Sequence, residues 1–134
     1  MLNKSITQDL SLFVARIVAG VFMLPHGWSK FNKIMEGNYK FPDPIGIGEK
    51  ASLFCTAGAE FFGSILLIAG LLTRFSAGAL LFTMLVAGLV HHWADPMDDK
   101  EGSLIYAIVY MMILVFGAGK FSADYLIKTY LLKK

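Results

Sequence analysis

The chain has 134 residues, of which 56% are hydrophobic and 16% charged, and its formal net charge is +2. A soluble domain has roughly 45–50% apolar and about 25% charged residues, and so short a chain has too little interior to hide the apolar surplus from water. The composition excludes a disordered chain, and the near-neutral charge argues against a nucleic-acid partner. The remaining class is an integral membrane protein in contact with the lipid bilayer.

The distribution of apolar residues predicts one transmembrane domain over residues 1–134. A membrane-spanning helix needs about 20 mostly apolar residues, and four stretches approach this length: Leu10–Phe31, Ala51–Leu72, Phe75–His92 and Ser103–Gly117. A polar loop follows the first stretch, only Thr73–Arg74 separates the second from the third, and the acidic segment Trp93–Gly102 precedes the fourth. Short connections between antiparallel helices are typical of an up-and-down bundle, so we predict an all-α, integral membrane four-helix bundle.

The two ends of the chain have different expected roles. Arg16 interrupts the apolar run of the first stretch, and Pro25 stands where a cleavage site would be sought, so we expect this stretch to be retained rather than removed as a signal peptide. In the tail Ser122–Lys134, apolar pairs one turn apart alternate with lysines. This pattern predicts a short interfacial helix that lies on the membrane surface.

The basic residues give an expected orientation. With an even number of spans, both termini lie on the same side of the membrane. Seven basic residues fall on that side: Lys4, Arg16, Arg74, Lys120, Lys128, Lys133 and Lys134. Five fall on the other: Lys30, Lys33, Lys40, Lys50 and Lys100. The excess of positive charge favours cytoplasmic termini.

Five ionisable residues lie within or near the predicted spans: Arg16, His26, Glu60, His91 and His92. A charge at the centre of a bilayer costs roughly 2.5–3.5 kcal/mol on insertion scales, so each is a candidate site residue. With a rise of about 1.5 Å per residue, His26, Glu60 and His91 fall in the outer half of the membrane, together with two tyrosines of the fourth span, Tyr106 and Tyr110. Arg16 falls deeper, about 22 Å from the same side.

Glu60 gives the sharpest signal. Its neighbours three and four residues away are all small: Thr56, Ala57, Gly63 and Ser64. Small residues let membrane helices approach closely, so the Glu60 carboxylate is expected to point into the bundle. Arg16 or a histidine is its expected partner, and the pair serves either a function or the locking of the helices. Lys30 and Trp93 are interpreted as anchors at the membrane interface.

The histidines and tyrosines are candidate ligand-binding residues. His26 follows Pro25, where a proline kink could hold an imidazole that binds a carbonyl ligand or shuttles protons. His91 and His92 point about 100° apart on a helix, so at most one can face a given site, and His91 is favoured. Tyr106 and Tyr110 share a face and belong either to a site or to the aromatic belt. Arg16 either snorkels to the interface or pairs inside the bundle.

With these positions marked, the chain resembles the DoxX family of small four-helix bacterial membrane proteins. The resemblance is carried, in this order, by "ARIVAGVFMLPHGWSKF", "AEFFGSILLIAGLLTRFSAGAL", "HH" and "FGAGKFSADYL". It implies a place in the bacterial inner membrane and a relation to the small subunits of thiosulfate:quinone oxidoreductases. It also marks motif positions, which here are Arg16, His26, Gly27, Lys30, Glu60, Gly70, Arg74 and one of the paired histidines.

Three functions compete. The leading hypothesis is a quinone-interacting component of an oxidoreductase system, with His26 and His91 as donors to the quinone and Glu60 as a proton relay, acting with a redox partner subunit or as a homo-oligomer. Since Cys55 is the only cysteine, dithiol exchange within the chain is excluded. A haem held by two histidines is a less favoured alternative. The third is a non-catalytic scaffold or small-solute carrier, in which the same polar residues lock the bundle or line a path. No metal site is expected.

Overall fold

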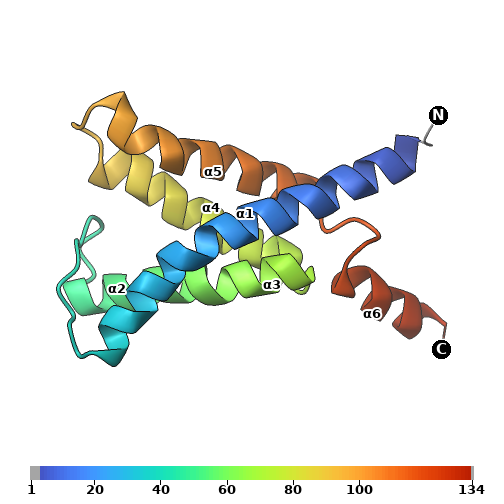
Figure 1. Ribbon diagram of the computed structural model, residues 1–134, viewed down its shortest axis with the longest axis horizontal. Helices are drawn as coiled ribbons and strands as arrows, with labels where there is room; N and C mark the ends of the chain where they lie inside the picture. Colours follow the sequence, from blue (N-terminus) through green and yellow to red (C-terminus); the bar gives the residue numbers. More distant parts are fainter. Residues whose placement is uncertain (1–3, 134) are drawn as a thin grey trace.

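The structure is a computed structural model that describes residues 4–133. Lys134 and the side chain of Lys4, which both enter the charge count, lie outside the described part. The described residues form helices joined by turns and loops, with no strand among them (Figure 1). The helices are α1 (Lys4–Met35), α2 (Glu49–Ala57), α3 (Gly63–Ala69), α4 (Thr73–Leu85), α5 (Met97–Phe116) and α6 (Ala123–Leu132). The prediction of an all-α protein is confirmed.

Two π-helical segments interrupt the regular helices. The first, η1 (Gly58–Phe62), joins α2 to α3 without a break, and the second, η2 (Val86–His91), prolongs α4. Three resulting helices are long and apolar enough to cross a membrane: Ser5–Met35, Glu49–Ala69 and Thr73–His91. Helix α5 is apolar over most of its length, but its first turn carries Asp98 and Asp99, which favour a helix N-terminus.

Several predicted boundaries differ from the structure. Helix α1 extends beyond Leu10–Phe31 at both ends and continues through Pro25. The turn after α3 lies at residues 70–72 rather than at Thr73–Arg74, which instead begin α4. Gly70 explains the difference, because its left-handed backbone (φ 70°) ends α3 while its N–H bonds the Leu67 carbonyl.

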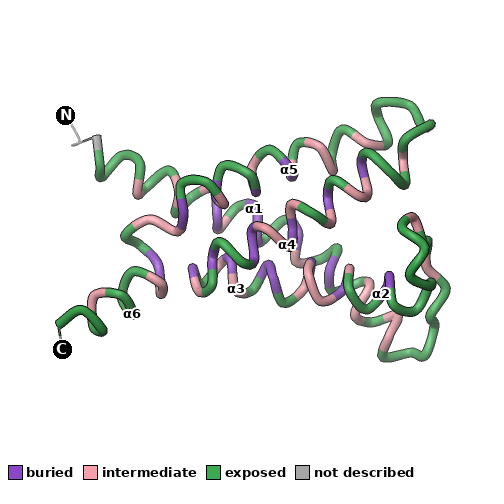
Figure 2. Tube along the Cα trace, turned by 180° about the vertical axis from the view of Figure 1, so that it is seen from behind, coloured by how far each residue is buried: buried purple, intermediate pink, exposed green. Residues whose placement is uncertain are grey.

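The helices form two diverging groups. In Figure 1, α1 packs along α2 and α3, while α4 packs along α5, and the two groups separate towards the end opposite the chain termini. Both termini lie at the other end. The buried residues gather where the helices cross (Figure 2), and the outer surfaces are exposed. The core contains Ala19, Met23, Leu67, Leu80 and Tyr110.

Arg16 holds the end of the molecule near the termini together. Its side chain is fully buried, and its guanidinium donates hydrogen bonds to the carbonyls of Leu67 (2.9 Å), Ile68 (3.4 Å) and Phe121 (2.5 Å). Of the two expectations for Arg16, pairing inside the bundle is therefore the one observed. Its acceptors are backbone carbonyls, including those at the C-terminal end of α3, where a positive charge is favourable.

The start of α6 completes the turn between α3 and α4. The Asp124 carboxylate accepts hydrogen bonds from the N–H groups of Leu72 (2.8 Å) and Thr73 (2.9 Å), and the Asp124 N–H bonds the Gly70 carbonyl (2.8 Å). These bonds satisfy amides at the start of α4 that have no partner within the helix. They also hold Leu72 in a left-handed conformation (φ 48°), which is unusual for a residue with a side chain.

Candidate functional site

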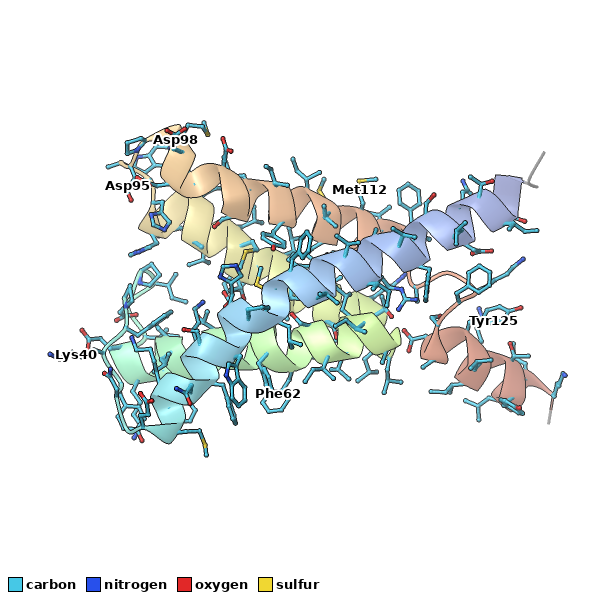
Figure 3. The ribbon with its side chains drawn as sticks, in the orientation of Figure 1. Lys40, Phe62, Asp95, Asp98, Met112 and Tyr125 are labelled. Atoms are coloured by element: carbon cyan, nitrogen blue, oxygen red, sulfur yellow. The ribbon has the colours of Figure 1, made fainter. Side chains whose placement is uncertain are left out.

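The diverging end of the molecule contains a cavity of about 750 Å³. Figure 3 shows this end, with Lys40 in the loop after α1, Asp95 in the connection that leads to α5, and Asp98 in the first turn of α5. The walls combine apolar side chains with a few ionisable ones. The lining residues include Met23, His26, Lys30, Phe41, Ile47, Cys55, Glu60, Phe82, Thr83, Met84, His91, His92, Asp98, Asp99, Ser103 and Tyr106.

An ion pair lies in the cavity wall. The Lys30 Nζ is 2.5 Å from the Glu60 Oε2, and the side chains are 22% and 5% exposed, respectively. The prediction that Glu60 points into the protein is confirmed, but its expected partner, Arg16 or a histidine, is wrong. Lys30 is therefore not a simple interface anchor. One turn of helix separates it from His26, so the α-helical spacing brings both side chains to the same wall.

The close approach of α1 to η1 makes this pair possible. A Cβ atom at Gly27 would collide with the backbone of Glu60 and Phe61. Because Gly27 has no side chain, the backbones of α1 and η1 meet directly, as is common for small residues between membrane helices.

Replacing Gly27 with alanine is expected to push α1 and η1 apart and to destabilise the protein by about 1–3 kcal/mol through overpacking. Unfolding in mixed SDS micelles measures this change. Gly58→Ala is the matched control, since a Cβ there meets nothing within 4 Å, and alanine is roughly 1 kcal/mol more favourable than glycine in a helix. An equal effect of both replacements would contradict the close contact.

All three histidines line the cavity. The expectation that at most one of His91 and His92 faces a given site is wrong. That expectation assumes α-helical geometry, but His91 ends the π-helical segment, and the backbone of His92 leaves the helix (φ −95°, ψ 22°). The two rings meet at a centroid distance of 4.5 Å, and the His92 Nδ1 is 2.7 Å from the Asp95 Oδ2. His92 therefore pairs with a carboxylate, whereas His91 contacts the His92 ring.

The two tyrosines have different places. Tyr106 lines the cavity, whereas Tyr110 is fully buried below it. Their rings stack at a centroid distance of 5.9 Å with an interplanar angle of 19°. Arg16 does not line the cavity either, and the structure thus separates it from the candidate residues that do.

Both π-helical segments contribute residues to the cavity: Glu60 comes from η1, and His91 from η2. A π-helical turn inserts an extra residue into an α-helix, and such turns occur frequently at functional sites. The segments therefore turn a carboxylate and an imidazole towards one space from two different helices.

The loop between α1 and α2 covers part of the cavity with Phe41 and Ile47. Asp43 organises this loop, because its carboxylate accepts hydrogen bonds from the N–H groups of Gly48 (2.8 Å) and Ile47 (2.9 Å) and from the Ser52 hydroxyl (3.0 Å). These donors, the Gly48 N–H above all, favour the charged form and hold the pKa of Asp43 below its ordinary value.

The loop is expected to loosen in acid. Because the pKa of Asp43 is lowered in the folded protein, its stabilising effect is complete above the unfolded value of about 3.9 and disappears as the pH falls through the folded pKa. Hydrogen exchange of the peptide over residues 43–52, corrected for the intrinsic rate, measures the loss of protection. Asp43→Asn should remove this pH dependence; its persistence would exclude Asp43 as the cause.

Sequence reasoning missed Lys30 as the partner of Glu60 and missed the loop residues that cover the cavity. The spacing of residues along α1 does not reveal the first, because the pairing depends on how closely Gly27 lets α1 approach η1. The loop carries no signal either, since its apolar residues resemble those of any proline-rich connection.

The comparisons with known proteins agree with the family resemblance. The model of the DoxX family matches residues 11–93. An uncharacterized protein of Haemophilus influenzae is 33% identical to this chain over 133 residues, a match that covers 93% of this chain and 88% of that protein. No solved structure matches the chain.

Proposed function

Since the chain belongs to the DoxX family of membrane proteins, we propose that it is a membrane-embedded component of an oxidoreductase system and that its cavity binds the head group of a quinone. The observation that carries the proposal is an ion pair, Lys30 with Glu60, placed beside histidines in a cavity with otherwise largely apolar walls. Ligand sites for amphipathic molecules typically combine apolar walls with a few convergent polar groups.

The residues present fit a quinone. A quinone ring is flat and apolar at its faces and offers one acceptor oxygen at each end. Met23, Phe82 and Met84 supply apolar wall, and methionine adapts well to ring edges. Lys30 and His26, one turn apart on α1, are donors for one oxygen, and His91 on η2 is a donor for the other.

Proton transfer is the part of the chemistry that this chain performs. Reduction of a quinone to a quinol consumes two electrons and two protons. With Cys55 as its only cysteine, the chain has no dithiol to oxidise, so a redox partner protein supplies both electrons. His91 would donate one proton and the Lys30–Glu60 pair the other, and both would regain their protons from water.

The proposal includes an arrangement of the chain in the membrane. Helix α5 is the fourth span, which makes the domain a four-helix up-and-down bundle with both termini in the cytoplasm of a bacterial cell and the cavity near the outer face of the inner membrane. Helix α6 lies in the interface, because its exposed apolar residues include Tyr125, Leu126, Tyr130 and Leu131. A homo-oligomer or a partner subunit docks against the spans.

Cys55 provides a built-in test, because this single thiol lines the cavity and is exposed. Decylubiquinone, whose ring is fully substituted and does not add thiols, is expected to slow maleimide labelling of Cys55 in the purified protein. Decyl alcohol is the control for the alkyl chain. Equal protection by both compounds would contradict a quinone site and would favour the alternative of a solute carrier with an apolar path.

The variant Glu60→Gln distinguishes a quinone-binding role of Glu60 from a purely structural one. A quinone site predicts weaker protection of Cys55 by decylubiquinone with little change in thermal unfolding, because glutamine keeps the size and a hydrogen-bonding oxygen, and the remaining charge, Lys30, is 22% exposed and reaches water. A purely structural ion pair predicts the reverse: unchanged protection and a lower unfolding temperature. The second result would favour a non-catalytic scaffold.

A further inference from the structure

The core between the cavity and Arg16 contains an unusual set of polar atoms. Five buried side-chain atoms have no hydrogen-bond partner among the described residues: the Arg16 Nε, the Tyr110 hydroxyl and the hydroxyls of Ser64, Thr73 and Ser76. Each of these side chains is at most 1% exposed. They come from four helices, α1, α3, α4 and α5, so no single local motif explains them.

The contacts between helices place these atoms in order along the molecule. Glu60 and Tyr106 line the cavity, and Ser64 and Tyr110 follow them by one helical turn each, away from the cavity. Gly63 on α3 faces Leu80 on α4. Ser76 lies one turn from Leu80 on α4, on the side away from the cavity.

Arg16 marks the far end of this series, since it bonds the Leu67 carbonyl on α3. The axial distance from Glu60 to Leu67 is about 10 Å, which three or four waters can bridge at hydrogen-bond spacing.

Such atoms need partners. An unpaired hydroxyl in an apolar interior costs roughly 1–3 kcal/mol on mutational scales, and buried waters commonly satisfy several such groups at once. Serine and threonine can instead turn to the carbonyl four residues earlier, as Thr83 does to Ala79. Neither the Tyr110 hydroxyl nor the Arg16 Nε can reach its own helix in that way, so a local solution does not satisfy the whole set.

We propose that this core holds a file of bound waters, hydrogen-bonded to Tyr110, Ser64 and Ser76, that runs from Glu60 to Arg16. The file solvates the Glu60 carboxylate from the side opposite the cavity. In the proposed quinone reaction, on which this role rests, the file keeps the Lys30–Glu60 pair hydrated while the quinone occupies the cavity.

Arg16 closes the file. Its guanidinium bears a fixed positive charge at the end of the row of hydroxyls far from the cavity and donates to three carbonyls there. A fixed positive charge repels protons and cations in aqueous pores. The file therefore ends at Arg16 and opens no leak across the protein.

Cysteine accessibility to Ag⁺ tests the file without any quinone. In a Cys55→Ser background, Ser64→Cys and Ser76→Cys each place one thiol on the proposed file, while Ala77→Cys, the adjacent and fully buried core position, is the matched control. Ag⁺ is close to water in size and reaches thiols through hydrated paths. The thiols left free after timed exposure are counted with a fluorescent maleimide in SDS.

The serine positions are expected to react about tenfold faster than Ala77→Cys, because water keeps a thiol more acidic than an apolar core does. Equal rates at all three positions would overturn the proposal, whether slow or fast. The decylubiquinone test on the unaltered Cys55 is independent of this result. If decylubiquinone does not protect Cys55 but Ser76→Cys reacts quickly with Ag⁺, the quinone site is refuted and the file is kept. If decylubiquinone protects Cys55 but Ser76→Cys reacts as slowly as Ala77→Cys, the file alone is refuted.

Discussion

Lys30→Met is expected to destabilise the protein by about 3 kcal/mol and to abolish protection of Cys55 by decylubiquinone. The replacement keeps the length of the side chain but leaves the Glu60 carboxylate, which is 5% exposed, without its ammonium partner. Breaking an ion pair in a protein interior costs roughly 3–5 kcal/mol, and the 22% exposure of Lys30 argues for the lower end of that range. Unfolding in mixed SDS micelles gives the change in free energy.

Two further variants identify the cause. In Lys30→Met/Glu60→Gln the uncompensated carboxylate is gone, so much of the lost stability should return while quinone protection stays absent. Lys33→Met is the matched control, because the half-buried Lys33 makes one exposed hydrogen bond, from its ammonium to the Lys40 carbonyl (2.8 Å), and the loss of such a bond at the surface changes stability by about 0.5 kcal/mol or less. If the double variant is no more stable than Lys30→Met, the ion pair is not the origin of the loss.

Arg16→Met is expected to cost about 3–4 kcal/mol and to release the segment that leads into α6. The change removes charged hydrogen bonds to the carbonyls of Leu67, Ile68 and Phe121. Hydrogen bonds to charged groups contribute roughly 1.5–3 kcal/mol each, and the free energy needed to bury the guanidinium offsets part of their sum. Of these three bonds, only the one to Phe121 joins the segment to α1, and the other hydrogen bond between them, from the Lys120 N–H to the Asp9 carboxylate (3.1 Å), is exposed. Trypsin cleavage after the exposed Lys120 should therefore accelerate together with the loss of stability.

Arg74→Met is the comparison for this prediction. Arg74 also donates to a backbone carbonyl at the same end of the molecule, that of Val115, but the bond is long (3.4 Å) and exposed. We expect little change in either stability or cleavage. Arg16→Met and Arg74→Met with equal cleavage rates would show that Arg16 does not hold the segment.

The helices were predictable, because apolar length and the breaks between apolar stretches identify them. The burial of Glu60 was also predictable from the small residues one turn away on its own helix. The partner of Glu60 was not, since depth estimated from the ends of the spans placed Lys30 at the interface. Only the contact of Gly27 with the backbone of Glu60 and Phe61 fixes α1 against η1 and brings Lys30 within reach.

The geometry of the cavity depended on a feature that hydrophobic periodicity does not report. A π-helical turn changes the direction of the residues in it, but it leaves the apolar composition of the stretch unchanged. His91 and His92 were therefore assigned by a rule for α-helices that does not hold at the end of η2. The role of Arg16 depended likewise on Phe121, more than a hundred residues away in sequence.

The shared turn between α3 and α4 has a consequence for biosynthesis. The N–H groups of Leu72 and Thr73 depend on the Asp124 carboxylate, and the Gly70 carbonyl depends on the Asp124 N–H. A ribosome delivers Asp124 only after all four long helices have been made. The hairpin of α3 and α4 therefore enters the membrane with its turn incomplete, and the turn is completed only when Asp124 has been translated.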